Sequence, residues 1–342
     1  HNMKSLWIAG FPSFLGGADT ELLHNIDLWR EYDIDVNLVP MFGCDPKIKE
    51  YVTNLGCKVY DYDKTIFKDK IVASWCNGQF LKNLLEIMKY GKPSQVLFAN
   101  CMTWLFNAEK EAHQKGWIDK FIFVSNYQEK LLVPQLEKIN TTNKLKDYFP
   151  YFNTNNPMQK LQFKYKENND YFCMGRVSRD DPAKFSSDAW NIFYKVCSPV
   201  PTKTFILGMS DKVKNKIGEP PKGLDWMYWS PNSIPVNEFY DRIQILIHKT
   251  GGSRESFGRT ILESYCSGVI PIVEDNYAMP QLVIDGETGY RCKTSDEFSY
   301  RASQLAFDSN LRKKITYNGY NFLVNNLCNK DKCVDPWIKL LN

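Results

Sequence analysis

The chain has 342 residues, of which 43% are hydrophobic and 24% charged, and this is a globular composition at a length typical of two domains. The net charge is only +4, shared about equally by the halves before and after Tyr165, so there is no strong nucleic-acid signal. No apolar run approaches the length of a membrane span and no signal peptide is recognised, so we expect a cytoplasmic protein whose only membrane contact would be peripheral.

The first half alternates short apolar runs with segments of helical periodicity. Strands are predicted at 5–9, 35–40, 58–60, 96–99 and 121–124. Helices are predicted at 19–30, 78–89, 104–115 and 127–139. Residues 140–169 are polar and rich in Asn and Lys, and we interpret them as a linker.

The same alternation returns after the linker. Strands are predicted at 171–175, 204–208, 243–248 and 269–273. Helices are predicted at 188–197, 257–267, 295–307 and 310–325, with a shorter one beginning at 238 and another in the tail at 335–341. Strands that alternate with helices are typical of a parallel sheet covered on both faces.

We therefore predict an α/β protein with two Rossmann-like, doubly wound domains and a cleft between them, because such folds bind ligands at the carboxyl ends of their strands. The predicted domains are 3–165 and 166–325, and the tail 326–342 is expected to pack back on the first. The ten cysteines are irregularly spaced and include no Cys-x-x-Cys pair, so buried thiols are favoured over a disulfide framework or a zinc site.

The segment 251–263 carries the most chemistry. A strand is followed by a glycine-rich loop and then a helix, so the amides of residues 258–260 would lie at a helix N-terminus, which favours an anion such as a diphosphate. Glu255 lies in the loop and Glu263 about two turns into the helix, a spacing that suits the hydroxyls at the two ends of a sugar nucleotide. The alternative is an ordinary helix start with an acidic residue before it and a solvated Glu263.

This segment and the residues after it resemble a known family. Glu255-Ser-Phe-Gly-x4-Glu263, followed by Ser267-Gly-Val-Ile-Pro-Ile-Val273 and Asp285-Gly-Glu-Thr-Gly-Tyr290, resembles the retaining glycosyltransferases of family 4. The resemblance is sharp over 171–290 and looser before it. It implies the GT-B fold of two facing Rossmann-like domains, the first on the acceptor side and the second binding the nucleotide sugar.

The resemblance also implies roles for single residues. Glu255 would contact the donor sugar and Glu263 the nucleotide ribose, while the backbone from Phe257 to Thr260 would hold the donor phosphates. The donor-binding residues implied in this segment are Glu255, Ser256, Phe257, Gly258, Arg259, Thr260 and Glu263.

Cations follow the first strand of the second half. Arg176 and Lys184 are placed where two positive charges could neutralise a diphosphate leaving group, and the resemblance implies this catalytic role for them beside Glu255. Their spacing is longer than the common family form, and Arg179 is the second candidate for the Lys184 position. The alternative is a solvated charged loop.

Two weaker sites complete the donor prediction. Gly16 and Gly17 follow the first strand, where glycine allows a phosphate or sugar to approach the backbone closely, and the loop lacks the spacing of a dinucleotide fingerprint. Met227 and Tyr228 are candidates for covering the base, against the alternative of aromatic packing under a loop.

The predicted reaction needs no cofactor and no metal ion. No Asp-x-Asp motif lies where a divalent ion would need a pair of carboxylates, and Asp180 and Asp181 are adjacent within the cationic loop. Cations and the helix N-terminus would stabilise the charge instead. We expect transfer of a hexose-type sugar from a UDP- or GDP-sugar, with retention of configuration, to a hydroxyl of a glycan, a lipid-linked sugar or a small molecule.

Other functions fit parts of the pattern. A nucleotide-sugar epimerase would form free product without an acceptor, and a phosphorylase would need a pyridoxal lysine and a longer chain. A non-catalytic sugar-nucleotide-binding module and a glucosyltransferase acting on modified DNA are further alternatives. The sequence does not indicate the oligomeric state, the donor base, the sugar or the acceptor.

Overall fold

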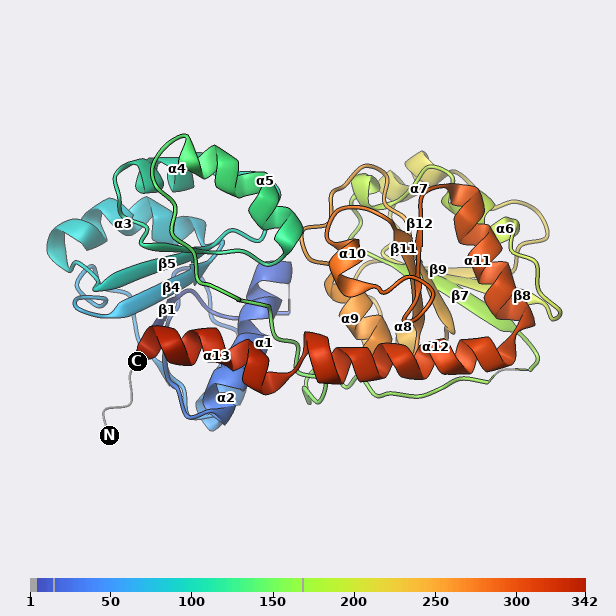
Figure 1. The fold of residues 1–342 in the computed structure, drawn as a ribbon, viewed down its shortest axis with the longest axis horizontal. Helices are drawn as coiled ribbons and strands as arrows, with labels where there is room; N and C mark the ends of the chain where they lie inside the picture. Colours follow the sequence, from blue (N-terminus) through green and yellow to red (C-terminus); the bar gives the residue numbers. More distant parts are fainter. Residues whose placement is uncertain (1–4, 15, 168) are drawn as a thin grey trace. The chain divides into compact units, whose positions relative to one another are not determined.

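The computed structural model describes residues 5–14, 16–167 and 169–342, and the chain forms two compact units. The first unit runs to Asn153 and also contains residues 328–342, and the second comprises Thr154–Leu327 (Figure 1). The change of unit lies before the boundary at 165/166 that the sequence suggested. Leu15, within the predicted glycine-rich loop, and Met3 and Lys4, at the start of the predicted first domain, lie outside the described residues.

The first unit contains a six-stranded parallel sheet with the order β3-β2-β1-β4-β5-β6. Its strands are β1 (Ser5–Ala9), β2 (Asp35–Val39), β3 (Lys58–Val59), β4 (Ile71–Trp75), β5 (Gln95–Ala99) and β6 (Lys120–Ile122). Its helices are α1 (Gly17–Glu31), α2 (Pro46–Asn54), α3 (Gly78–Tyr90), α4 (Asn107–Gln114), α5 (Asn126–Glu137) and α13 (Lys330–Leu341).

The tail helix α13 is part of the core of the first unit. Trp337 is fully buried, and its ring centroid lies 4.9 Å from that of Trp29 on α1 and 5.9 Å from that of Trp75 on β4. Large aromatic rings bury much apolar surface, so this cluster ties the end of the chain to the first sheet. Residues of α3 and α5, among them Phe80 and Leu132, pack in a separate core cluster with β4 and β5.

The second unit contains a second six-stranded parallel sheet with the order β12-β11-β10-β7-β8-β9. Its strands are β7 (Phe172–Val177), β8 (Thr202–Leu207), β9 (Trp226–Trp229), β10 (Ile245–His248), β11 (Ile270–Glu274) and β12 (Tyr290–Cys292). Its helices are η1 (3-10, Pro182–Lys184), α6 (Ala189–Tyr194), α7 (Asp211–Ile217), α8 (Val236–Tyr240), α9 (Arg259–Cys266), α10 (Met279–Leu282), α11 (Ser295–Phe307), α12 (Ser309–Phe322) and η2 (π, Leu323–Leu327).

Both sheets have the same topology when the strands of each unit are counted in chain order, namely third, second, first, fourth, fifth, sixth. Every residue of β10 is buried, and Ile245 and Ile247 belong to one core cluster with residues of α6, α7 and α11. Strands that are buried on both faces form continuous apolar runs in the sequence, and most strands of both sheets could be predicted for this reason. The predicted fold class, two doubly wound parallel sheets of GT-B type, is confirmed, and the cleft between the units stays a prediction.

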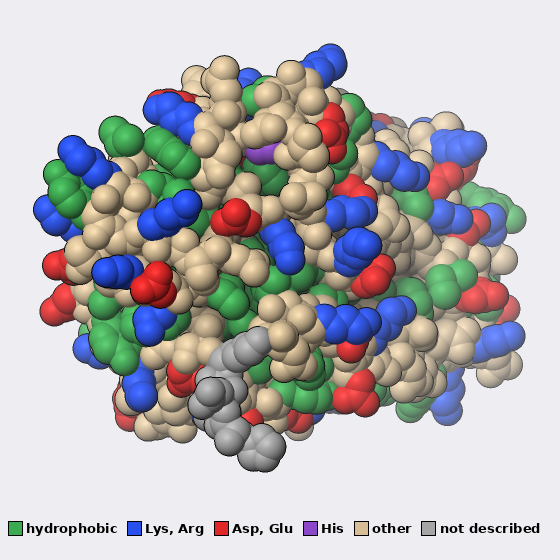
Figure 2. Space-filling view, turned by 60° about the vertical axis from the view of Figure 1, so that its left-hand side comes forward, with side chains coloured by type: hydrophobic (Ala, Val, Ile, Leu, Met, Phe, Trp, Pro, Cys, Tyr) green, Lys and Arg blue, Asp and Glu red, His purple; other side chains and the backbone are tan. Residues whose placement is uncertain are grey.

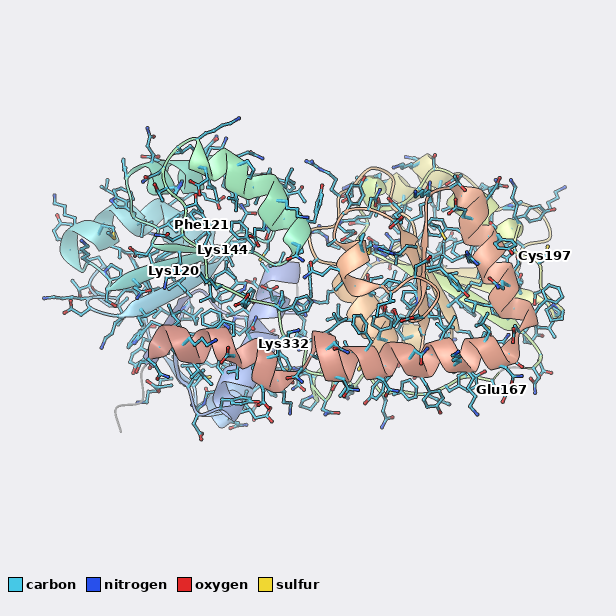
Figure 3. The ribbon with its side chains drawn as sticks, in the orientation of Figure 1. Lys120, Phe121, Lys144, Glu167, Cys197 and Lys332 are labelled. Carbon is cyan, nitrogen blue, oxygen red and sulfur yellow. The ribbon has the colours of Figure 1, made fainter. Side chains whose placement is uncertain are left out.

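Residues 140–153 do not form a linker. Asn143 accepts a backbone hydrogen bond from Phe121, and Phe121 accepts one from Leu145, so Lys144 bridges to β6 (Figure 3). Tyr151 and Phe152 are buried in the first unit. The expectation of a linker fails here because the polar composition hides backbone pairing and a few buried rings.

Other elements were missed or displaced. The predicted helix 104–115 begins only at Asn107, because the amide of Phe106 donates to Glu109 and starts the helix there. The short elements α2, β4, α7, β9, α10 and β12 were not predicted. Met227 and Tyr228 lie on the edge strand β9 rather than on a loop.

The surface carries interspersed charges of both signs over the face drawn in Figure 2, in keeping with the small net charge. All ten cysteines belong to the described residues and are free thiols. In the described part of the chain, no helix combines the length and the apolar character that crossing a membrane would require.

Candidate functional site

The candidate site lies in the second unit, at the neighbouring parallel strands β7 and β10, from which the chain continues toward opposite edges of the sheet. β7 is followed by β8 on one side of the pair, and β10 is followed by β11 on the other. In open α/β sheets, ligands bind beyond the carboxyl ends of the strands at such a reversal. Arg176 lies near the end of β7 and His248 is the last residue of β10.

The loops that follow these two strands are hydrogen-bonded to each other. The amides of Gly251 and Ser253 both donate to the carbonyl of Ala183, at 2.9 and 3.1 Å. A side chain at Gly251 would lie 2.2 Å from the carbonyl oxygen of Phe185, so only glycine fits. These contacts hold the cationic loop after β7 against the glycine-rich loop after β10.

Glu255 lies at the centre of the site. Its Oε1 is 3.2 Å from Nζ of Lys184 and 3.4 Å from Nε2 of His248, and the three side chains are 14%, 17% and 4% exposed. Burial alone would raise the pKa of Glu255, but the His248 contact and the charges of Lys184 and Arg176 outweigh burial and hold the pKa well below its usual range. Glu255 is therefore an ionised carboxylate at neutral pH.

Arg176 is a buried residue that contacts His248 on the side of the ring away from Glu255. It is only 3% exposed, and its guanidinium donates to the carbonyls of Val177 and Lys184, at 3.1 and 2.6 Å, and to Nδ1 of His248. Burial lowers its pKa to about 10, while Glu255 and Glu274 oppose that shift, so Arg176 stays charged. The positive charge of Arg176 therefore acts on Glu255 although the guanidinium is buried.

The helix α9 begins beside Glu255. Gly258 occupies its N-cap with φ of 95°, in the left-handed region that favours glycine, and a side chain there would lie 2.5 Å from the end of Met279. No side chain of the described residues caps this helix. The predicted donor-phosphate residues Phe257, Gly258, Arg259 and Thr260 thus surround a helix N-terminus, and their role stays a prediction.

Glu263, further along α9, is a buried carboxyl. It is 8% exposed, and burial raises its pKa to about 7, partly offset by the charge of Arg259. Its hydrogen-bond partner in the described residues is Nε2 of Gln159, at 3.5 Å. A carboxylate so poorly satisfied favours a ligand that brings hydroxyl donors.

The other predicted residues of the second unit, Arg179, Met227 and Tyr228, do not join this cluster. Arg179 is exposed and no ion pair of the described residues involves it. Gly16 and Gly17 lie in the first unit at the start of α1, where Gly16 has φ of 100°. Tyr228 stacks on Trp226 along strand β9 with ring centroids 5.0 Å apart, and Lys214 covers its ring, while the role of Met227 and Tyr228 at the base stays a prediction.

Sequence reasoning missed His248. A single histidine at the end of an apolar strand has no local pattern, and its partner Arg176 is 72 positions away. The signal was positional, since His248 ends the strand that leads into the glycine-rich loop. Within the described ranges, no group of three or more His, Cys, Asp or Glu side chains is arranged to hold a metal ion.

Comparisons with known proteins indicate which family and which fold the chain resembles. The family described as glycosyl transferases group 1 matches residues 158–322. No curated protein sequence matches the chain significantly.

Solved structures resemble the whole chain. Anabaena HepE in complex with UDP and glucose aligns with a TM-score of 0.70 at 13% identity, covering 99% of both chains. A glycosyltransferase from Rickettsia africae aligns with a TM-score of 0.69 at 13% identity, covering 100% of this chain and 98% of the other. TarM, from S. aureus, aligns with a TM-score of 0.73 at 11% identity, covering 100% of this chain and 99% of the other.

At such identities the structural likeness establishes the fold, and the family match covers the unit that holds the cluster around Glu255. The family match over the second unit and the fold of the whole chain together support assignment to the glycosyltransferase superfamily.

Proposed function

We propose that the protein transfers a hexose-type sugar from a nucleotide-sugar donor to a hydroxyl of an acceptor. The observation that carries the proposal is the Lys184–Glu255 pair at the switch point of the second sheet, beside the N-terminus of α9. A carboxylate accepts hydrogen bonds from sugar hydroxyls, while a lysine and a helix N-terminus both attract phosphate. The HepE complexes contain UDP or UDP-glucose, which makes UDP the first base to test.

Each side chain has a proposed role in the bound state. Glu255 contacts the donor sugar, Lys184 leaves Glu255 to bind the diphosphate, and Arg176 contributes its charge from behind Lys184. The backbone of residues 256–260 holds the phosphates, and Glu263 accepts the ribose hydroxyls. The first unit, with Gly16 and Gly17, supplies the acceptor side and approaches the donor.

The proposed chemistry is transfer with retention of the anomeric configuration. The acceptor hydroxyl attacks the anomeric carbon on the face from which the nucleoside diphosphate departs, and the departing phosphate takes the hydroxyl proton. The bond between the anomeric carbon and the phosphate oxygen breaks as the new glycosidic bond forms. Lys184 and Arg176 stabilise the charge on the leaving group, so the proposal requires no metal ion.

The first test is a thermal-shift series with UDP, GDP, ADP and their common sugar conjugates, with and without EDTA. A ligand that binds only the folded protein raises the melting temperature. We expect one base to do so and EDTA to leave the shift unchanged. No shift with any nucleotide would contradict the proposal, and a shift that EDTA abolishes would contradict its metal-free form.

The second test identifies the reaction. The stabilising nucleotide sugar is incubated with glycan, lipid-linked and small-molecule acceptors, and proton NMR reads the anomeric configuration of the product. We expect acceptor-dependent release of the nucleoside diphosphate and a retained configuration. Free product formed at the same rate without any acceptor would indicate an epimerase instead. Sedimentation with anionic vesicles would test the proposed peripheral membrane contact of a cytoplasmic enzyme.

A further inference from the structure

His248 is a buried histidine that no step of the proposed transfer uses. It lies between Arg176, which contacts its Nδ1, and Glu255, whose Oε1 is 3.4 Å from its Nε2. We infer that His248 is a positioning residue that fixes the carboxylate of Glu255, so that Oε2 remains directed to the donor sugar. This inference rests on the proposed role of Glu255 in the transfer.

The contact with Arg176 determines which nitrogen of His248 carries the proton. A guanidinium can only donate hydrogen bonds, so Nδ1 accepts and is unprotonated. The neutral ring then carries its proton on Nε2, the nitrogen that faces Glu255. Burial, followed by the charge of Arg176, lowers the pKa of His248 to about 4, which agrees with a neutral ring at physiological pH.

Arg176 is itself anchored to the backbone. Its remaining contacts are the carbonyls of Val177 and Lys184, and its guanidinium lies 5.6 Å from the ring centroid of Phe185. These partners belong to β7 and the segment that follows it. Arg176 therefore fixes the orientation of His248 relative to the sheet. A reactive group is held precisely when its supporting side chains are themselves locked by packing and hydrogen bonds.

The support from His248 becomes more important once a donor binds. In the structure, Oε1 of Glu255 accepts a hydrogen bond from Nζ of Lys184 at 3.2 Å and lies 3.4 Å from Nε2 of His248, which has no hydrogen-bond partner among the described residues. When Lys184 turns to the diphosphate, His248 is the contact that remains on Oε1. Loss of the Nε2 proton donor should therefore release the carboxylate in the donor complex, after nucleotide binding has already been achieved.

Two amide substitutions separate the two sides of the ring. In His248→Gln the amide nitrogen takes the place of Nε2 and can donate to Glu255. In His248→Asn the amide oxygen takes the place of Nδ1, so the side chain accepts from Arg176 but no longer reaches Glu255 with a donor. We expect His248→Asn to lower kcat at least tenfold with the Kd of the nucleoside diphosphate changed by less than twofold. We expect His248→Gln to restore kcat to within about threefold of the wild type.

A purely structural role predicts a different pattern. The Asn and Gln variants would then lose melting temperature in proportion to their loss of activity, or both would keep wild-type kcat. Either result overturns the inference while the proposed function stands, because the wild type still transfers sugar. The variant Ser299→Ala, which removes a buried hydrogen bond to Ile192 away from the site, calibrates how stability alone affects kcat.

A second readout does not depend on turnover. Nitrogen-15 NMR of the imidazole rings, with His248 assigned by loss of its signals in His248→Gln, should show the Nε2–H tautomer from pH 8 to about pH 5.5. Replacement of Glu255 by Gln should shift the Nε2–H resonance, whereas Glu297→Gln should not. An Nδ1–H tautomer, or a resonance that Glu255→Gln does not shift, overturns the inference. This readout is independent of sugar transfer, whose absence in the wild type would contradict the proposed function instead.

Discussion

The two units have the same strand order, and their switch points carry different chemistry. In the first unit, β1 and β4 are the neighbours at the reversal, and the indole of Trp75 at the end of β4 donates to the carboxylate of Glu21 at 2.5 Å. In the second unit, β7 and β10 place Arg176 and His248 behind Glu255. A shared topology thus provides an edge for ligands, while the residues at the strand ends decide what that edge can bind.

Each unit also buries one carboxyl whose pKa burial raises to about 7, Glu109 in the first and Glu263 in the second. Glu109 accepts hydrogen bonds from the side chain of Asn100 at 2.7 Å and from the amide of Phe106 at 3.0 Å. Glu263 has only the long contact with Gln159 among the described residues. Glu109 therefore stabilises its own loop through one oxygen, while its Oε2 has no hydrogen-bond partner among the described residues, and the binding of a ligand by Glu263 stays a prediction.

The largest expected effect comes from Glu255→Gln. This substitution keeps the shape of the side chain but removes the negative charge that Lys184 and His248 surround, so we expect kcat to fall about 100- to 1,000-fold. Nucleoside diphosphate affinity should stay within a few-fold, as measured by calorimetry. Glu297→Gln, an exposed carboxyl in the same unit, should leave both quantities unchanged. Wild-type kcat in Glu255→Gln would remove Glu255 from the mechanism.

The buried carboxyls give a matched pair for pH. Because the folded pKa of Glu263, about 7, exceeds its usual value of about 4.3, its stabilising contribution is present at low pH and lost as pH rises through 7. For each carboxyl the loss is about 4 kcal/mol, and urea unfolding at several pH values should show a smaller loss of stability with rising pH in both Glu263→Gln and Glu109→Gln.

A bound nucleotide should distinguish the two. If ribose hydroxyls donate to the charged form of Glu263, nucleotide affinity rises between pH 6 and pH 8. This rise should disappear in Glu263→Gln and persist in Glu109→Gln. The same pH dependence in all three proteins would show that Glu263 does not contact the nucleotide.

A smaller effect is expected from Lys184→Met. The substitution keeps an apolar stem of similar length but removes the cation that would pair with the diphosphate, and we expect the Kd for the nucleoside diphosphate to rise about tenfold. The affinity of the variant should also depend less on salt. Lys195→Met, which removes an exposed lysine paired with Asp296, is the control. Equal affinities of the Lys184 variant and the wild type would show that Lys184 does not bind the phosphates.

The smallest effect tests the first unit. Gly17 is the first residue of α1, and a side chain there would meet no atom within 4 Å, so Gly17→Ala should fold without strain. If this loop approaches the donor or acceptor, KM should rise several-fold with no loss of melting temperature. An unchanged KM would argue that ligands do not approach this backbone.

Sequence periodicity predicted most of the fold because buried parallel strands form short, continuous apolar runs. The helix α11 was predicted with its observed bounds, Ser295–Phe307. Elements of few residues, such as β12, were missed because three residues carry no period. The segment before Asn153 was read as a linker because its anchors are distant, and the amide of Asn153 donates to His24, 129 positions away.

The site was predictable in part for a related reason. Glu255 and Lys184 could be named because each follows a predicted strand and because the surrounding motif resembles a known family, and parallel strands bring such segments together. The burial of Arg176 and the presence of His248 could not be named, because both depend on side-chain packing between strands far apart in the sequence. Their proposed roles in transfer stay predictions.

Hydrogen–deuterium exchange with and without UDP tests the central claim most directly, namely that the second switch point binds the nucleotide. The account predicts slowed exchange in 249–260, including the first turn of α9, and in the loop 178–185, with the largest change in these two segments. Slowed exchange confined to the first unit, with both segments unchanged at saturating UDP, would contradict it.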